Sequence, residues 1–298
     1  MRQATVSETT ATEDSPVIEL GLLVVAPHPD DECISTGGTL ARYVDEGLRV
    51  KLVHCTRGEA GDNLAGIDLD GRTVPELRLE ELAAGLAVLG VTDHEFLGYR
   101  DSGMLDTDDN EHPDSFHRAD LDEAASRLAA IIRDFRPQVV TSDDERGGYG
   151  HPDHVKANRV TARAVELAAD PDADVAGQPW RVAKRYVHTL PKGRLLEAHN
   201  LLLELMGGSP WGAEPITNVS DLDFGTPDDE ITALVPVADL DRKMAALRQH
   251  RTQVADDSFF FNIPAQVTQR FFGTEPFALR EGEAHGTPED DLFAGLRP

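Results

Sequence analysis

Aliphatic runs that alternate with helical patterns are the feature that most constrains how this chain can fold. The run Val17 to Ala26, VIELGLLVVA, is almost continuously aliphatic, which is typical of a strand buried on both faces of a sheet. Helix and strand patterns alternate over about 130 residues. Further strands are predicted at 49–55, 94–98 and 137–142, and helices at 38–46, 75–90 and 119–135. This order predicts an α/β fold, with a Rossmann-like, mostly parallel sheet and flanking helices.

The domain organisation predicted from the pattern is simple. Residues 1–16 are rich in Thr, Ser and Glu with few apolar groups, so a mobile N-terminal tail is expected there. The C-terminal half is less regular, and no Pro/Ser-rich boundary separates it from the first half. Residues 17–298 are therefore predicted to form one domain. Its C-terminal elements are predicted as strands at 182–189 and 230–237 and helices at 194–206 and 238–251.

The net charge and the cysteine content limit which binding partners and which cellular compartment are expected. The formal net charge is −26, and a surface that acidic repels nucleic-acid phosphates and anionic lipids. No stretch approaches the roughly 18 apolar residues of a membrane span, and the first twenty residues do not resemble a signal peptide. Two cysteines are too few for a disulfide framework. We expect a cytoplasmic protein without nucleic-acid or membrane partners, and no pattern in the sequence indicates its oligomeric state.

Two segments that combine histidine, proline and aspartate follow predicted strands. The first, Pro27 to Glu32, reads PHPDDE directly after the first strand, and the second, Gly148 to His154, reads GYGHPDH shortly after the fourth. A lone histidine in a turn is usually a surface group, and a lone aspartate there usually caps a helix. Two such segments at the carboxyl ends of parallel strands, where open α/β sheets bind ligands, instead indicate a metal site.

The donor set in these segments suits a catalytic metal ion. A zinc ion with His/His/carboxylate ligands keeps a position for water and lowers the pKa of that water to about 7. His28, Asp31 and His154 can supply this set, and non-haem iron(II) suits the same ligands. Asp30 is the candidate to accept a proton from the water, and His151 is the candidate acid for a leaving amine.

The two motifs resemble those of the LmbE-like (PIG-L) zinc deacetylases, which remove the acetyl group from N-acetylglucosamine units. Within that family the chain is similar to the mycothiol-pathway deacetylases that act on N-acetylglucosaminyl-inositol. Segments that carry this similarity are CTRGEAGD, RLEEL, YRDSGM, FRPQVVTSDDERGGYGHPDHV, KMAALRQHRTQV and EDDLFAGL. The resemblance implies a zinc-dependent amidohydrolase whose partner is a small amino-sugar substrate.

The resemblance also implies roles for further residues. It places zinc on His28, Asp31 and His154 and makes Asp30 the general base. Tyr149 would polarise the amide carbonyl, and Asp153 would orient His151, the implied general acid. Arg78 and Asp101 match positions that hold sugar or inositol hydroxyls. Asp62 stands where the similar subfamily has glutamate, so a contact there would be shorter or lost.

The expected reaction is hydrolysis of the N-acetyl group of N-acetylglucosaminyl-inositol, which releases acetate and glucosaminyl-inositol. The alternatives are a mycothiol S-conjugate amidase and a deacetylase of another N-acetylglucosamine-containing metabolite. A nicotinamide-dependent oxidoreductase is a poor match because no G-x-G-x-x-G follows the first strand. A non-catalytic sugar-binding homologue would lack a ligand or the base, and none is missing here.

Overall fold

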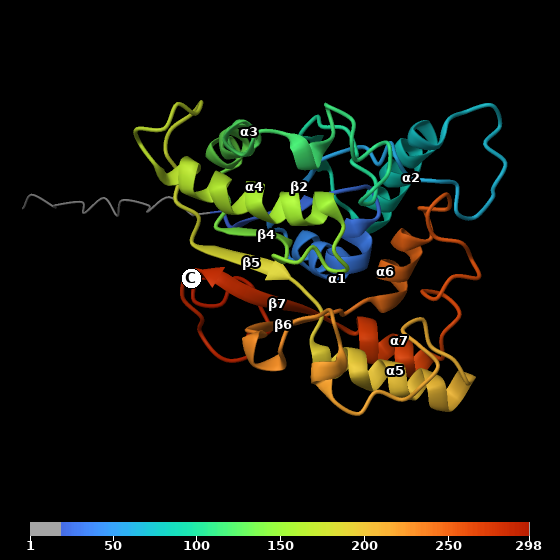
Figure 1. The fold of residues 1–298 in the computed structure, drawn as a ribbon. Helices are drawn as coiled ribbons and strands as arrows, with labels where there is room; N and C mark the ends of the chain where they lie inside the picture. The colour runs from blue at the N-terminus through green and yellow to red at the C-terminus, as the bar shows by residue number, and fades with distance from the viewer. Residues whose placement is uncertain (1–18, 298) are drawn as a thin grey trace, which may run out of the picture.

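The computed structural model describes residues 19–297, so the tail predicted at 1–16 lies outside the described residues. Figure 1 shows the helices and strands in chain order. The strands are β1 Gly21–Ala26, β2 Arg49–His54, β3 Asp93–Phe96, β4 Val139–Asp143, β5 Lys184–His188, β6 Ala233–Pro236 and β7 Thr274–Glu281. The α-helices are α1 Asp31–Asp45, α2 Val74–Leu89, α3 Leu121–Phe135, α4 Pro152–Ala169, α5 Lys192–Met206, α6 Leu240–Leu247 and α7 Ala265–Phe272.

A seven-stranded sheet in the order β3-β2-β1-β4-β5-β7-β6 forms the centre of the fold. The five strands from β3 to β5 are mutually parallel, and β7 pairs antiparallel with both β5 and β6. The predicted α/β class with a mostly parallel sheet is confirmed. Because the chain runs outward from β1 to β2 and β3 and then returns to β4, the strand order reverses between β1 and β4. Such a reversal leaves a crevice at the carboxyl ends of the two strands.

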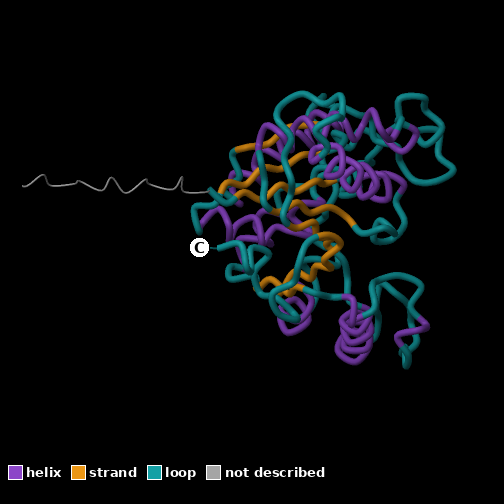
Figure 2. The backbone as a smooth tube through the Cα atoms, turned by 90° about the vertical axis from the view of Figure 1, so that its left-hand side faces the viewer, coloured by secondary structure: helices purple, strands orange, loops and turns teal. Residues whose placement is uncertain are grey.

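The helices cover both faces of this sheet, as Figures 1 and 2 show. In β1, Leu22 and Val24 belong to a core cluster with residues of α1, α2 and α6, whereas Leu23 and Val25 belong to one with residues of α3 and α4. Successive strand residues point to opposite faces, which is why a strand covered on both sides is aliphatic throughout. A third cluster joins α5 and α7 below the main body in Figure 1.

Helix α1 begins at Asp31, seven residues before the start predicted from its apolar spacing. Its two glycines, Gly37 and Gly38, weaken the helical pattern in the sequence. The structure explains why residue 38 is glycine, because a Cβ atom at Gly38 would lie 2.5 Å from a methyl group of Val237. Close packing of the segment after β6 against α1 thus requires glycine in the middle of this helix, and the early start brings Asp31 into the first helical turn.

The C-terminal half departs from the prediction in several elements. The helix predicted at 238–251 is limited to Leu240–Leu247, and α4, α7 and β7 were not predicted. Strand β7 is the last in sequence yet lies between β5 and β6. No local pattern reports such an insertion, because it depends on pairing between segments far apart in the chain.

Candidate active site

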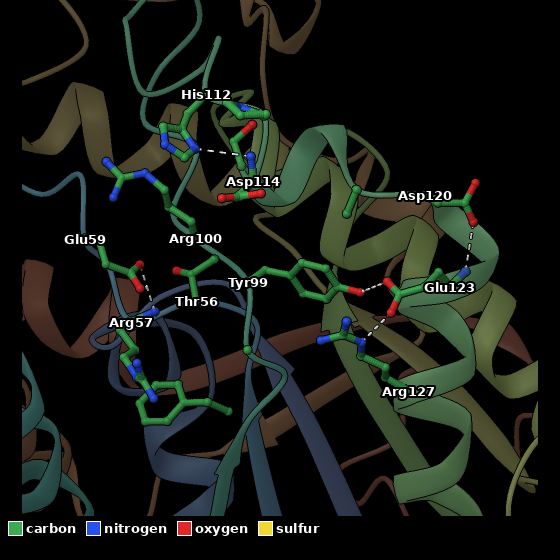
Figure 3. A pocket seen from close by; sticks show the side chains of 15 residues that line it. Thr56, Arg57, Glu59, Tyr99, Arg100, His112, Asp114, Asp120, Glu123 and Arg127 are labelled. Carbon is green, nitrogen blue, oxygen red and sulfur yellow. Dashed lines mark hydrogen bonds and ion pairs between the residues drawn. The ribbon is translucent and has the colours of Figure 1, made fainter.

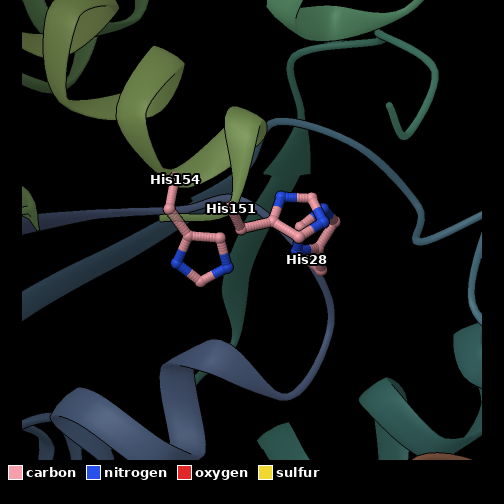
Figure 4. Close-up of side chains that lie close together, drawn as sticks. All are labelled: His28, His151 and His154. Carbon is pink, nitrogen blue, oxygen red and sulfur yellow. The ribbon is translucent and has the colours of Figure 1, made fainter. Parts of the chain in front are cut away.

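The two histidine segments meet in the crevice between β1 and β4. His28 follows β1, whereas His151 and His154 stand at the start of α4, which follows β4. Figure 4 shows the three imidazoles side by side although more than a hundred residues separate the segments. Their ring centroids lie 4.7 to 5.3 Å apart. The structure therefore brings together the residues predicted from the sequence.

Asp31 lies between the two histidines predicted to share a metal with it. Its Oδ2 is 3.2 Å from Nδ1 of His28 and 3.4 Å from Nε2 of His154. Ligands held about 2.1 Å from a tetrahedral zinc ion lie about 3.4 Å from one another. All three side chains are at most 13% exposed. The two distances from Asp31 and the burial of all three side chains fit a bound divalent metal.

Carboxylates lie behind both imidazoles. Nδ1 of His154 is 2.8 Å from Asp143 Oδ1, and Nε2 of His28 is 3.2 Å from Asp153 Oδ2. Metal-bound histidines usually have such a partner on the second ring nitrogen, which fixes the ring and its tautomer. Burial alone would lower the pKa of His154, but the Asp143 and Asp31 carboxylates outweigh it and raise that pKa to about 9. The site thus stabilises positive charge, as a cation site must.

A second donor set replaces Asp31 with His151. His28, His151 and His154 offer ligand atoms within 4.8 Å of one another. His151, however, is the N-cap of α4, and its Nδ1 accepts a 3.1 Å hydrogen bond from the Asp153 backbone N–H. Only its Nε2 remains available, and Nε2 carries the proton in the neutral ring. Burial, followed by the charges of His28 and His154, lowers the pKa of His151 to about 4. The set with Asp31 supplies an anionic ligand and keeps His151 beside the metal position.

Asp30 holds a strained position between β1 and α1. Its φ of 118° is rare for a residue other than glycine, and its side chain makes no capping hydrogen bond to the helix. Strain of this kind persists where the surroundings enforce it and is frequent at functional sites. Burial, together with the neighbouring Asp31 charge, raises the pKa of Asp30 to about 6 against the opposing charge of Arg78. A carboxylate with a pKa near 6 suits a general base.

The predicted substrate-binding residues occupy different environments. Arg78 is buried and donates to the carbonyls of Pro29 and Gly58 at 2.6 and 3.0 Å, and its Nη2 lies 3.4 Å from Asp30 Oδ2. Its guanidinium thus supports the loop that presents the candidate base. Asp101 is also buried, with Oδ1 3.4 Å from Nε2 of His28.

The remaining predicted residues differ more from expectation. Tyr149 is 69% exposed on the loop before α4, with its ring centroid 5.7 Å from that of His154. Asp62 is exposed in the loop between β2 and α2, and its carbonyl accepts from Gln253 Nε2 at 2.9 Å. The structure does not bring the Asp62 carboxylate into the histidine cluster.

Asp153 has a different partner from the one predicted. Its carboxylate contacts His28 Nε2 and accepts from the Ser102 backbone N–H at 2.9 Å and from the Ser102 hydroxyl. Only its backbone N–H contacts His151. As the second residue of α4, Asp153 is fully buried and points across the crevice toward β1, whereas His151 stands at the helix start. Its carboxylate therefore orients a candidate metal ligand instead of the candidate acid.

Sequence reasoning missed a buried cluster around Glu32. The Glu32 carboxylate lies 3.0 Å from His54 Nε2 and 3.1 Å from His250 Nε2, and it accepts a 2.9 Å hydrogen bond from the Asp30 backbone N–H. Although burial raises the pKa of Glu32, the two histidines lower it well below its usual value. In the sequence, Glu32 has the signature of an ordinary acidic residue in a first helical turn. The cluster fixes the peptide of Asp30, whereas Arg78 contacts its carboxylate.

Replacing Glu32 by glutamine in the metal-free protein is expected to lower the free energy of unfolding by about 3–5 kcal/mol near neutral pH, because buried His250 loses its carboxylate. The pKa of Glu32 is depressed in the folded state, so its stabilisation is complete above the unfolded value of 4.5 and is lost on acidification. The difference from the wild type should therefore shrink below pH 4.5, as urea titrations at several pH values can measure. Glu204→Gln, at an exposed glutamate, is the matched control. Equal stability of both variants would contradict a charged Glu32 cluster.

A polar cavity of about 670 Å³ lies beside the candidate site and is shown in Figure 3. Its side chains are largely paired with one another: Arg127 Nε donates to Glu123 at 2.5 Å, and the Tyr99 hydroxyl also contacts Glu123. Glu59 at its edge accepts the Asp101 backbone N–H at 3.0 Å. The cavity thus adjoins the site through Glu59 but contains none of the clustered histidines.

Within residues 19–297, no helix has the length and apolar character needed to cross a bilayer.

Comparisons with known proteins agree with this geometry. Residues 23–165 match the family model described as PIG-L, GlcNAc-PI de-N-acetylase. A Thermomonospora curvata protein named 1D-myo-inositol 2-acetamido-2-deoxy-alpha-D-glucopyranoside deacetylase is 46% identical over 92% of this chain and 96% of its own length. A protein of the same name from Acidothermus cellulolyticus is 45% identical over 92% of this chain and 94% of its own length.

Solved structures share the fold. A conserved protein of Thermus thermophilus aligns with a TM-score of 0.55 and 27% identity, covering 90% of this chain and 96% of that protein. The N,N'-diacetylchitobiose deacetylase of Pyrococcus horikoshii aligns with a TM-score of 0.58 at 21% identity over 87% of this chain and 82% of its own, a likeness of fold. Identity above 40% over nearly the full length of curated relatives, with the family match across both histidine segments, shows that this chain belongs to the PIG-L (LmbE-like) deacetylase family.

Proposed function

We propose that this protein hydrolyses the N-acetyl group of N-acetylglucosaminyl-inositol, a step of mycothiol biosynthesis, and releases acetate and glucosaminyl-inositol. The proposal rests mainly on one observation, the position of Asp31 Oδ2 between His28 and His154. Asp30, the residue directly before Asp31, has a strained backbone conformation. The substrate is inferred from the names of relatives that align over nearly the whole chain. Together they support amide hydrolysis on an amino sugar.

The proposed metal is zinc, held by His28, Asp31 and His154, and iron(II) is the alternative that the same donors accommodate. When bound, such an ion would polarise the acetyl carbonyl and lower the pKa of the attacking water. Asp143 and Asp153 would hold the imidazoles of His154 and His28 in place from behind.

Different side chains are proposed to carry out the successive proton transfers of the reaction. Water forms a bond to the acetyl carbon, Asp30 accepts the proton of that water, and the bond to the sugar nitrogen then breaks. His151 is proposed to donate to this nitrogen as the imidazolium, because a neutral ring that gave up its Nε2 proton would become an imidazolate. The imidazolium carries a proton on Nδ1, where the neutral ring accepts the capping hydrogen bond from the Asp153 N–H. A proton on Nδ1 would displace this capping bond, so protonated Asp30 is the alternative donor. Tyr149, exposed beside His154, is proposed to donate to the carbonyl oxygen as negative charge develops there.

Sugar recognition is proposed to depend on two buried residues near the candidate active site. Asp101 and Arg78 are the proposed partners of the hydroxyl groups, and both already contact catalytic candidates, His28 and Asp30. Arg78→Ala should therefore slow every amide substrate, because it also removes the cation beside Asp30. For this reason the ratio of the kcat/KM values for two substrates reports sugar recognition better than either value alone.

The metal-loaded wild-type enzyme should show a kcat/KM for N-acetylglucosaminyl-inositol about 100-fold above that for free N-acetylglucosamine. Polar groups built to bind the missing hydroxyls are left unpaired by the smaller substrate, and 100-fold corresponds to about 2.7 kcal/mol. Release of free amine from each substrate measures the ratio. Equal rates would remove the inositol claim and leave deacetylation intact. Faster cleavage of a mycothiol conjugate would favour the amidase alternative.

A further inference from the structure

A second cavity, of about 370 Å³, opens directly from the proposed metal ligands. Asp31 and His154 line one end of it, with Tyr149 beside them. Six aromatic side chains are among its other lining residues: Trp211, Phe224, Phe259, Phe260, Phe271 and Phe272. We call this space the aromatic pocket. It lies between the parallel part of the sheet and the third core cluster.

The aromatic walls come from segments far apart in the chain and pack against one another. The Trp211 ring centroid is 5.5 Å from that of Phe259 and 5.9 Å from that of Phe271, and the centroids of Phe271 and Phe272 are 4.8 Å apart. Phe271 and Phe272 are buried, whereas Trp211 and Phe259 are partly exposed. The pocket is thus a walled space whose surface is mainly apolar.

Three of the charged groups that line the aromatic pocket are paired within the protein. Lys243 Nζ lies 2.6 Å from Glu275, and Asp144 accepts the Thr189 hydroxyl at 2.6 Å. Among the described residues, Asp143 Oδ2, at the His154 end, has no hydrogen-bond partner, whereas the aromatic walls offer a ligand apolar contact. The hydroxyl groups of a sugar or of inositol would be poorly matched to such a lining.

The aromatic pocket and the residues proposed for sugar recognition are separate parts of the site. Asp31 and His154 line the pocket, whereas Asp101 and Arg78 are not among its lining residues. The amide nitrogen carries the sugar, so the acyl substituent on the other side of the carbonyl points away from it. That substituent is the part of the substrate directed at the apolar space.

An acetyl methyl group fills only a small part of this volume. At roughly 30 Å³ for each water-sized group, the pocket has room for on the order of ten such groups. Resting on the proposed function, we propose that the aromatic pocket binds an apolar acyl chain, so that amides of fatty acids with about four to six carbons are substrates of the same site. Water forms a bond to the acyl carbon, the bond to nitrogen breaks, the nitrogen takes a proton, and the products are the fatty acid and the free amino sugar.

The test compares acetyl, butyryl and hexanoyl amides of glucosaminyl-inositol with the metal-loaded enzyme. Each buried methylene should raise kcat/KM about fourfold, so the butyryl amide should exceed the acetyl amide about tenfold or more. Rates that fall with each added carbon, while the acetyl amide is hydrolysed, would overturn the acyl pocket alone. Failure on the acetyl amide would instead overturn the proposed function.

A variant that fills the pocket separates its contribution from that of the reacting groups. Ser35→Phe places a ring at the wall formed by α1 and should remove the chain-length gain while acetyl hydrolysis stays within a few-fold of the wild type. Ser220→Phe, at an exposed serine that is not among the lining residues, is the matched control and should keep the gain. If Ser35→Phe slows N-acetylglucosaminyl-inositol but not N-acetylglucosamine, the pocket binds inositol and the proposal is overturned.

Binding can also be followed without turnover. The chain has two tryptophans, so Trp180→Phe leaves Trp211 as the only one. Trp180 lies outside the pocket, where its indole donates to the Pro137 carbonyl at 2.7 Å. Hexanoate should change the emission of Trp211 at concentrations where acetate does not, and Ser35→Phe should abolish the change. An emission unaffected by hexanoate would contradict the proposal even if every variant were inactive.

Discussion

His154→Ala is expected to abolish both stoichiometric metal binding and deacetylation while the protein stays folded. His154 supplies one of three proposed ligands, and its Nε2 lies 3.4 Å from the Asp31 carboxylate. Its removal leaves two ligands, and the Asp143 carboxylate behind them no longer has an imidazole to orient. Elemental analysis after dialysis gives the metal content, and circular dichroism checks the fold.

Two further variants make this result specific. His285→Ala, at an exposed histidine outside the site, should keep both metal and activity. Asp143→Asn keeps every ligand but weakens the partner of His154, so metal affinity should fall by about 10- to 100-fold. Full metal occupancy in His154→Ala would reject the ligand assignment, and the same outcome in both His28→Ala and His154→Ala would reject the site.

Asp30→Asn should retain its metal and lose about 10²- to 10⁴-fold in kcat, the range associated with general acid–base groups. Asparagine has nearly the same shape and is among the residues that tolerate positive φ, so the 118° backbone conformation can persist. What disappears is a carboxylate whose pKa of about 6 lets it accept a proton near neutral pH. Steady-state kinetics beside metal analysis separates this effect from loss of the ion.

The result would be unambiguous because each possible failure leaves a different sign. A variant that loses metal would show that Asp30 is needed to hold the proposed ligands in place. Activity within a few-fold of the wild type, with metal bound, would show that another group accepts the proton. Loss confined to KM would place Asp30 in substrate binding instead.

The parts of this molecule that the sequence predicted correctly depend on local patterns. The aliphatic run of β1 and the alternation after it report a parallel sheet because each strand there is buried on both faces. Once the sheet is assumed, residues after β1 and β4 must meet at its carboxyl edge, which is why the sequence predicts that His28, Asp31 and His154 lie close together, as the structure shows.

The parts that could not be predicted depend on distant contacts. The pairing of Glu32 with His250 joins residues 218 positions apart, and no pattern around His250 distinguishes it from an ordinary helix-end histidine. The direction of the Asp153 side chain is set by its position within the first turn of α4, which the motif alone does not specify. Likewise, the aromatic pocket forms only when separate C-terminal segments pack together.

Strand β7 comes last in the sequence but lies inside the sheet, so the sheet can be completed only after nearly all of the chain has been made. It occupies the place between β5 and β6, and its Glu275 accepts the backbone N–H groups of Gly38 and Thr39 in α1 at 2.8 and 2.7 Å. During synthesis the ribosome therefore delivers the proposed metal ligands long before the strand that completes the sheet beside them. Until β7 arrives, the edge of β5 lacks this partner, and open strand edges invite pairing with other chains. The nascent N-terminal half thus exposes an unpaired sheet edge until β7 is made, and helix α1, which begins at the proposed ligand Asp31, gains its contacts with Glu275 only near the end of translation.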